Sequence, residues 1–269
     1  MKPFAIAPLS KAKLQKYARL HQKKFRDQEG LFLAEGLRTV RELCLNLPGE
    51  EMLVALLVRE GESEVARFAQ PWKGKLFSIS EKECSRIAET ATSQGIFGVF
   101  RQQPSPDPAA KTLLAKSVRS LIVVLDEVQD PGNVGTILRT AVWFGADAIV
   151  CSSGTADRYN AKAVRSCAGS IYAINHYGVD RLDLELRRFQ DQGFCIVGSS
   201  LEGKDFREFS SWPEKQVLVI GNEANGISEA VRAVADRLVR IPHGGTSVRV
   251  ESLNASVSAA ILMERLTLS

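Results

Sequence analysis

Two apolar runs in the last third of the chain end abruptly in loops of glycine and polar residues. Residues 217–220 are followed by the loop 221–226, and residues 238–241 are followed by the loop 242–245. Continuous apolar runs of this kind are typical of strands buried on both faces, and ligands of open α/β sheets bind beyond the carboxyl ends of such strands. Glycines there let backbone amides approach a ligand closely. With residues 252–254 opening a final helix, the pattern predicts one pocket formed by two strand ends and a helix start.

A third loop of the same kind follows the apolar run 121–125 and leads into residues 130–141. Asn133 is predicted to be the N-cap of a helix that runs through Phe144, with Gly145 just past its end. Arg139 lies off the apolar stripe of this helix. We therefore expect its head group to face outward, toward the cleft or a partner subunit.

The motifs of several common chemistries are absent from the sequence. There is no phosphate-binding Walker A loop, no G-x-G-x-x-G and no H-E-x-x-H, and the three histidines have no metal-ligand spacing. Phosphoryl transfer, dinucleotide redox chemistry and zinc catalysis therefore lose their usual support, and no metal site is predicted.

Together, residues 130–141, 220–223, 241–242 and 252–256 resemble the three motifs of the SpoU (TrmH-type) RNA 2′-O-methyltransferases of the SPOUT superfamily, in the family's order. The resemblance implies S-adenosylmethionine as methyl donor, a deep C-terminal trefoil knot and a homodimer formed by the C-terminal domain. Pattern reasoning alone does not reach the knot, because knots are nearly absent from proteins at large. One departure from the family is the loop 244–251, which is about three residues longer than usual.

The resemblance also assigns site residues. The backbone at Gly221, Ile241 and Leu253 matches the positions that hold the donor. We interpret Arg139 as a clamp on the phosphate beside the target nucleotide rather than as a general base, because a guanidinium is effectively never deprotonated in a protein. Glu223 is expected to orient loop amides or Arg139. The residues that match the family's catalytic positions are Asn133, Arg139, Glu223, Ser252 and Asn254.

Two of these residues also have structural interpretations. Ser252 is sufficiently explained as the N-cap of the last helix. Asn254 is more informative about function, because the first turn of a helix has no structural need for it.

The net charge of +4 is concentrated near the N-terminus. Residues 1–103 contain 17 Lys and Arg against 12 Asp and Glu, and the segment 11–26 contains seven cations and no acid. Such a run is either an ordinary solvated helix face or a surface for RNA phosphates. RNA is favoured because cations without interspersed acids do not form i,i+4 pairs. The predicted RNA-binding residues are Lys11, Lys13, Lys16, Arg19, Lys23, Lys24 and Arg26.

The first hundred residues alternate predicted strands (31–33, 53–58, 76–79 and 96–100) with predicted helices (36–45, 62–70 and 80–89), which indicates a small α/β sandwich. Residues 25–40 are similar to the opening of the substrate-recruiting domain of many rRNA-directed SpoU enzymes, whose fold resembles RNA-binding ribosomal proteins. Alternating prolines at 104, 106 and 108 predict a semi-rigid spacer. We therefore expect an RNA-binding domain at 1–103, a linker at 104–116 and a methyltransferase domain at 117–269.

In the second domain, predicted strands at 121–125, 148–151, 171–176, 194–197, 217–220 and 238–241 alternate with predicted helices at 133–144, 162–167, 182–190 and 252–266. This alternation predicts a parallel sheet with helices on both faces.

Composition agrees with a cytoplasmic enzyme. Hydrophobic residues make up 45% and charged residues 25% of the chain, five widely spaced cysteines indicate reduced, buried thiols, and no membrane span or signal peptide is predicted. The predicted function is methyl transfer to a ribose 2′-hydroxyl of RNA, with ribosomal RNA favoured because a full domain precedes the catalytic one. The alternatives are a tRNA-directed enzyme and a non-catalytic RNA-binding or ribosome-assembly protein on the same fold.

Overall fold

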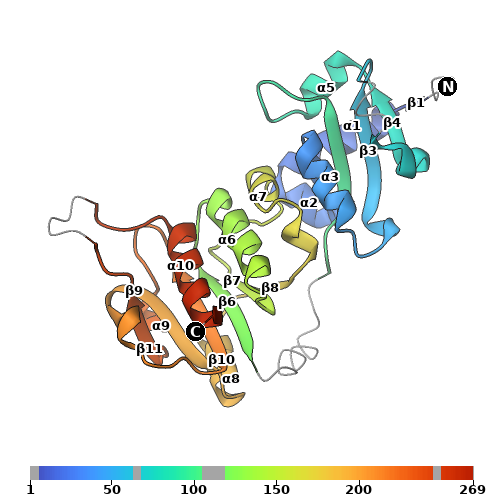
Figure 1. Cartoon of the computed structure of the whole chain (residues 1–269). Helices are drawn as coiled ribbons and strands as arrows, with labels where there is room; N and C mark the ends of the chain where they lie inside the picture. The colour runs from blue at the N-terminus through green and yellow to red at the C-terminus, as the bar shows by residue number, and fades with distance from the viewer. Residues whose placement is uncertain (1–5, 63–67, 105–118, 245–249, 269) are drawn as a thin grey trace. The chain divides into compact units, whose positions relative to one another are not determined.

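Two compact units make up the chain in the computed structural model, which describes residues 6–62, 68–104, 119–244 and 250–268 (Figure 1). The first unit contains Met1–Gln103 together with Asp157–Ala173, and the second contains Pro104–Ala156 and Ile174–Ser269. Residues 157–173 thus cluster with the first unit, although the chain reaches them through strands of the second. The predicted linker 104–116, the predicted helix 62–70 and the long loop 244–251 lie largely outside the described residues.

A five-stranded sheet with the order β1-β4-β3-β5-β2 forms the first unit. Strand β5 is antiparallel to β2 and β3, whereas β4 is parallel to β3 and β1. The predicted capping box is present at Ser80 and Glu83. The strands are β1 Ala7–Pro8, β2 Leu31–Glu35, β3 Leu53–Arg59, β4 Leu76–Ile79 and β5 Ile96–Arg101, and the helices are α1 Lys11–Ala18, η1 Arg19–His21, α2 Lys23–Glu29, α3 Leu37–Leu45, η2 Glu50–Met52, η3 Gln70–Lys75, α5 Glu81–Ile87, α7 Ala161–Ser166 and η5 Ser170–Tyr172.

Period-two alternation in the strands sends side chains to two cores. Leu31 and Leu33 of β2 pack into a cluster with Leu14 of α1 and Ile87 of α5, which therefore cover one face of the sheet. Phe32, between them, points to the opposite face. There its ring contacts aromatic rings contributed by residues 157–173.

A six-stranded sheet with the order β11-β9-β10-β6-β7-β8 forms the second unit, and all strand pairs among its described residues are parallel, as predicted. Its strands are β6 Ser120–Asp126, β7 Ala148–Ser152, β8 Asn175–Val179, β9 Cys195–Asp205, β10 Lys215–Gly221 and β11 Arg237–Arg240, and its helices are α6 Pro131–Trp143, α8 Leu182–Asp191, η6 Phe206–Glu208, α9 Glu229–Arg232 and α10 Ala255–Leu268.

Helices lie against both faces of this sheet. On one face α8 and α9 pack on alternate residues of the central strands, such as Ile122 and Val217. Helices α6 and α10 lie side by side, and α10 contacts β10 (Figure 1). The carboxyl ends of β6 and β10 are adjacent, with Gly221 opposite Asp126. The loops that follow these two strands are therefore brought together.

One predicted strand boundary is wrong. The strand expected at 171–176 is a 3-10 helix, η5, followed by β8, which begins at Asn175. The apolar side chains of Ile171 and Tyr172 are buried outside the strand, so apolarity alone misplaced its start. None of the five cysteines forms a disulfide. Cys44, Cys84 and Cys167 are buried as expected, whereas Cys151 and Cys195 are only half-buried.

Candidate active site

A cavity of about 110 Å³ opens at the carboxyl ends of the strands in the second unit. The loop after β10, the end of β11, the middle of β9 and the start of α10 contribute to it, as the loop pattern predicts. The residues that line it are Ser199, Ser200, Leu201, Ile220, Gly221, Asn222, Glu223, Arg240, Ile241, Ser252, Leu253, Ala255 and Ser258.

The loop after β10 is shaped by a tight backbone approach. A Cβ at Gly221 would lie 2.2 Å from the carbonyl carbon of Gly226 and 2.3 Å from the nitrogen of Ile227. Asn222 and Gly226 exchange two backbone hydrogen bonds of 2.9 Å, and Gly226 has a φ of +69°. A glycine is therefore required at position 221 because the loop packs so closely on itself. This close packing in turn shapes the wall of the cavity.

The carboxylate of Glu223 joins this loop to the loop after β6. Its oxygens accept hydrogen bonds from the backbone N–H groups of Gln129 (3.1 Å) and Asp130 (3.2 Å), and from Nδ2 of Asn133 (2.8 Å). This agrees with the predicted role of Glu223 in orienting loop amides. A carboxylate that already accepts three hydrogen bonds is held in place and is poorly suited to accept a substrate proton.

A second hydrogen bond extends the network to the last helix. Nδ2 of Asn254 donates to Oδ1 of Asn133 at 3.0 Å, and Oδ1 of Asn254 accepts from the backbone N–H and the hydroxyl of Ser256. Three segments far apart in the sequence therefore meet through Glu223, Asn133 and Asn254, next to the cavity that Glu223 lines.

Both predicted helix caps are wrong. The N-cap of α6 is Asp130, whose side chain accepts from the N–H of Gly132, and Pro131 occupies the first helical position, where its missing N–H costs nothing. Asn133 is instead a buried residue of the first turns. The side chain of Asn254, not Ser252, accepts N–H bonds at the start of α10. Asn254 therefore has both a structural and a bridging role, and Ser252 lines the cavity.

Arg139 is exposed on α6, and it does not line the cavity. Among the described residues it has no hydrogen-bond or ion-pair partner. Within a single chain, the structure thus brings together the other predicted site residues but leaves Arg139 facing outward.

The cavity also includes residues that the sequence motifs did not indicate. Ser199, Ser200 and Leu201 lie in the long strand β9, beyond its predicted end at residue 197, and Arg240 lies at the end of β11. A serine pair at the end of an apolar run was the available signal. These hydroxyls and the apolar side chains of Leu201 and Leu253 give the cavity both polar and apolar walls.

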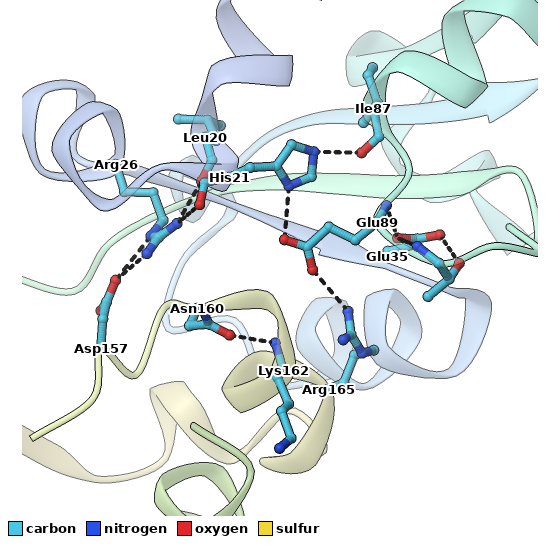
Figure 2. A network of polar contacts seen from close by, with 11 residues as sticks. Leu20, His21, Arg26, Glu35, Ile87, Glu89, Asp157, Asn160, Lys162 and Arg165 are labelled. Carbon is cyan, nitrogen blue, oxygen red and sulfur yellow. Dashed lines mark hydrogen bonds and ion pairs between the residues drawn. The ribbon is translucent and has the colours of Figure 1, made fainter. Parts of the chain in front are cut away.

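The seven predicted RNA-binding cations differ in their surroundings. Lys16 pairs with Glu29, and Lys23 pairs with Asp27 at 2.6 Å, so the expectation that this run forms no i,i+4 pair is wrong: its partner Asp27 lies one residue beyond it. Arg26 is buried, with its side chain 4% exposed, and pairs with Asp157 (Figure 2). Four are exposed and form no salt bridge among the described residues, although the charge of Lys11 helps to lower the pKa of the Glu83 carboxyl: Lys11, Lys13, Arg19 and Lys24.

Burial raises the pKa of the Glu223 carboxyl, but the hydrogen bonds from Asn133 and from the loop amides outweigh it, and the net pKa is lowered from 4.5. A lowered folded-state pKa gives stability that is present above the unfolded value and lost as the pH falls through the folded one. We therefore expect wild type to melt at a higher temperature than Glu223→Gln at neutral pH, and the difference to shrink as the pH falls from 4.5 through the lower pKa of the folded state. Thermal unfolding of both proteins across this range measures it; a difference that grows in acid would contradict the assignment.

Comparisons with known proteins agree with this geometry. Residues 120–264 match the model of the SpoU rRNA Methylase family, and residues 11–98 match that of an MRM3-like substrate binding domain. A 23S rRNA (guanosine(2553)-2'-O)-methyltransferase of Bacillus subtilis, RlmP, is 34% identical over 257 residues, which cover 94% of this chain and 95% of the relative.

Two solved structures are similar over nearly the whole chain. A putative RNA methyltransferase of the TrmH family from Porphyromonas gingivalis has a TM-score of 0.80 and 30% identity, and covers 97% of this chain and 99% of its own. An AdoMet-bound rRNA methyltransferase from Sinorhizobium meliloti has a TM-score of 0.77 and 29% identity, and covers 97% of this chain and 96% of its own.

The parallel sheet, the cavity at its carboxyl edge and these similarities define the class as that of the RNA methyltransferases. The chain belongs to the SpoU rRNA methylase family. In the described residues, no helix is long and apolar enough to cross a membrane, and no group of acidic, histidine and cysteine side chains could hold a metal ion.

Proposed function

We propose that the protein transfers a methyl group from S-adenosylmethionine to a ribose 2′-hydroxyl of ribosomal RNA. The observation that carries this proposal is the chain of hydrogen bonds through Glu223, Asn133 and Asn254, which joins the three family motifs beside one cavity. The Bacillus subtilis relative acts on 23S rRNA, and the similar Sinorhizobium meliloti structure holds AdoMet.

The cavity suits this donor chemically. Its apolar side chains, such as Leu201 and Leu253, offer contacts for a flat base, and its hydroxyls and carboxylate offer partners for the polar amino-acid part. The backbone at Gly221, Ile241 and Leu253 would hold the donor. When bound, S-adenosylmethionine supplies a methyl group on a positively charged sulfur, and Glu223 and the loop amides keep the cavity wall in place.

Incubating the protein with radiolabelled donor and total RNA, and then fractionating the RNA, tests the activity. Label in 23S or 16S RNA supports the proposal, label in tRNA alone would redirect it to the tRNA-directed alternative, and no label would leave a non-catalytic RNA-binding protein. Methylation of the 2′-oxygen blocks alkaline cleavage at that position, so an alkaline ladder of the labelled RNA locates the methyl group. A labelled nucleotide that alkali still cleaves would contradict ribose methylation.

Arg139 is assigned to the RNA phosphate in the site of a second subunit. It is exposed on α6, and the neighbouring outward residues of α6 and α10 are apolar: Trp143 is 84% exposed, Val257 47% and Leu268 72%. A patch of exposed apolar side chains on two adjacent helices suits a subunit interface.

We assign the homodimer to this face. Sedimentation of wild type and Trp143→Asp tests it: the variant is expected to be a monomer, and an unchanged dimer would exclude this face.

Residues 1–103 of the first unit are assigned to RNA recruitment as the RNA-binding domain, and residues 117–269 to the methyltransferase domain, which includes the segment 157–173 that clusters with the first unit. The family models that match residues 11–98 and 120–264 support this division. We also assign to α10 the trefoil knot implied by the family. The match of residues 120–264 to the SpoU rRNA Methylase family model supports it.

Within the first unit, Arg19 is the best prepared cation for a phosphate. Its guanidinium lies 3.6 Å from the centroid of the Phe25 ring, and it is exposed. Stacking on a ring fixes the plane of a guanidinium and leaves its N–H groups free at the edge, where they can bind a phosphate with two hydrogen bonds. Lys24, beside Phe25 in the sequence, is also exposed.

Neutralising Lys11, Arg19 and Lys24 together is expected to flatten the salt dependence of RNA binding. Each lost phosphate contact lowers the slope of log affinity against log salt by about 0.7–0.9. The matched control replaces Lys16 and Lys23, which already pair with Glu29 and Asp27 and should change the slope much less. Filter binding at several salt concentrations measures both slopes. Equal slopes for the two variants would show that the exposed cations do not contact RNA.

A further inference from the structure

Residues 157–173 connect β7 to β8 of the methylase sheet but are built into the first unit. The rings of Tyr159 and Tyr172 lie 4.9 and 6.1 Å from that of Phe32, measured between centroids. The Tyr159 hydroxyl accepts from the backbone N–H of Gln103, and the Tyr172 hydroxyl donates to the carbonyl of Arg101 at 2.6 Å. Both ends of this connection are therefore fixed to the first unit.

Arg26 of α2 ties the start of this connection to the cationic helices. Its Nη1 donates to the carbonyls of Leu20 (2.8 Å) and His21 (2.7 Å), and its Nε and Nη2 donate to one carboxylate oxygen of Asp157 at 3.0 and 2.6 Å (Figure 2). The Arg26 and Asp157 side chains are only 4% and 14% exposed. Removing one partner of such a buried pair leaves the other charge uncompensated.

Glu89 provides a second, more exposed tie. One carboxylate oxygen lies 3.0 Å from Nδ1 of His21, and the other accepts from Nη1 of Arg165 in α7 at 3.4 Å (Figure 2). The Glu89 side chain is 33% exposed, so this contact is weaker than that of Arg26 with Asp157.

On its other side, Asp157 follows directly on a segment bonded to the catalytic loop. The N–H of Ala156 donates to the carbonyl of Val128 at 2.9 Å, and the hydroxyl of Thr155 donates to the carbonyl of Leu125. Val128 is followed by Gln129 and Asp130, whose N–H groups bind Glu223. Asp157, whose carboxylate holds α2, is thus joined by one peptide bond to the loop segment that supports the Glu223 loop.

We propose that Arg26 and Asp157 are positioning residues for methyl transfer, which link the RNA-docking helices to the loop that holds Glu223. The link forms when Arg26 holds α2 against Asp157, and RNA bound to α2 strengthens it. This inference depends on the proposed function only for the identity of the ligand; the link itself is testable without RNA.

The first test is hydrogen–deuterium exchange of the full chain without RNA. In Asp157→Asn, the backbone amides of residues 126–135 are expected to exchange about tenfold faster than in wild type. An effect of this size is typical when a residue that couples two sites is mutated. The matched control is Asp27→Asn, which breaks the exposed Lys23–Asp27 pair of the same helix and should leave this loop unchanged. Unchanged exchange in Asp157→Asn overturns the link. An equal increase in the exchange rates of β3 and β10 also overturns the link, because it would indicate general destabilisation of the protein.

The second test separates positioning from docking. With saturating RNA and donor, single-turnover transfer in Asp157→Asn is expected to fall about tenfold while RNA affinity changes less than about threefold. Arg26→Lys, which keeps the positive charge at position 26, should lose less of the single-turnover rate than Asp157→Asn. Weaker RNA binding with an unchanged saturated rate would make the pair a docking element and overturn the proposal. If the wild type transfers no methyl group to RNA, the proposed function fails, and the exchange experiment still decides the link.

Discussion

Arg139→Ala is expected to lose nearly all methyl transfer, about 10²–10³-fold, while leaving donor binding nearly unchanged. The side chain lies outside the cavity of its own chain and has no polar partner among the described residues, so its removal disturbs neither the cavity nor the fold. If it grips the phosphate and stabilises charge developing on the ribose oxygen, its loss should lower the rate about 10²–10³-fold, as removal of one preorganised electrostatic group does in other enzymes.

Calorimetry with the donor and turnover on RNA measure the two quantities. Arg139→Lys, which keeps a charge but cannot make two parallel hydrogen bonds, should recover only part of the rate. Arg187→Ala, which removes an exposed arginine of α8, is the control and should retain full turnover. Full turnover in Arg139→Ala would remove Arg139 from the mechanism.

A hybrid dimer tests whether Arg139 serves the other subunit. One subunit would carry Arg139→Ala and the other Gly221→Ala, each with its own affinity tag. If the arginine acts across the interface, one of the two sites in the purified hybrid is intact, and about half of the wild-type rate per dimer is expected. An inactive hybrid would place Arg139 in the site of its own chain.

Gly221→Ala is expected to have the second largest effect, a loss of donor binding together with local destabilisation. The added methyl group would lie 2.2 Å from backbone atoms of Gly226, which cannot move aside as a flexible side chain does. We expect a cost of about 3 kcal/mol or more in the free energy of unfolding, because the loop must shift as a whole. That shift would displace Glu223 from the amides of Gln129 and Asp130.

The control is Gly244→Ala, since a Cβ there has no neighbour within 4 Å in the described part of the chain. It is expected to change stability by no more than about 0.5 kcal/mol. Denaturant unfolding and donor calorimetry compare the two variants. Normal donor affinity in Gly221→Ala would show that the cavity does not depend on this close approach.

The strands of the second unit were predictable because apolar runs such as 121–125 and 217–220 carry their own signal. The first residues of the helices were harder to predict. Asp130 and Asn133 are both good caps in the sequence, and only the placement of Glu223 opposite Asn133 shows why Asn133 faces inward. Ser200 and Leu201 were missed because strand β9 continues beyond its apolar start, where local pattern no longer marks it.

The role of residues 157–173 could not be predicted. The contact of Arg26 with Asp157 spans 131 positions, and nothing near either residue in the sequence indicates the other. Arg26 was grouped with its cationic neighbours because they share a charge. What distinguishes it is burial, which depends on tertiary packing rather than on local sequence.

The two-part composition of the first unit limits how this enzyme can diverge. An exchange of residues 1–103 with those of a relative would bring in a new surface around position 32 while retaining the host's Tyr159 and Tyr172. We expect functional chimaeras only when residues 157–173 are exchanged with them. Substitutions in residues 1–103 and in residues 157–173 should therefore be inherited together. We expect new RNA targets to be acquired when both stretches change, and not when residues 1–103 are exchanged alone.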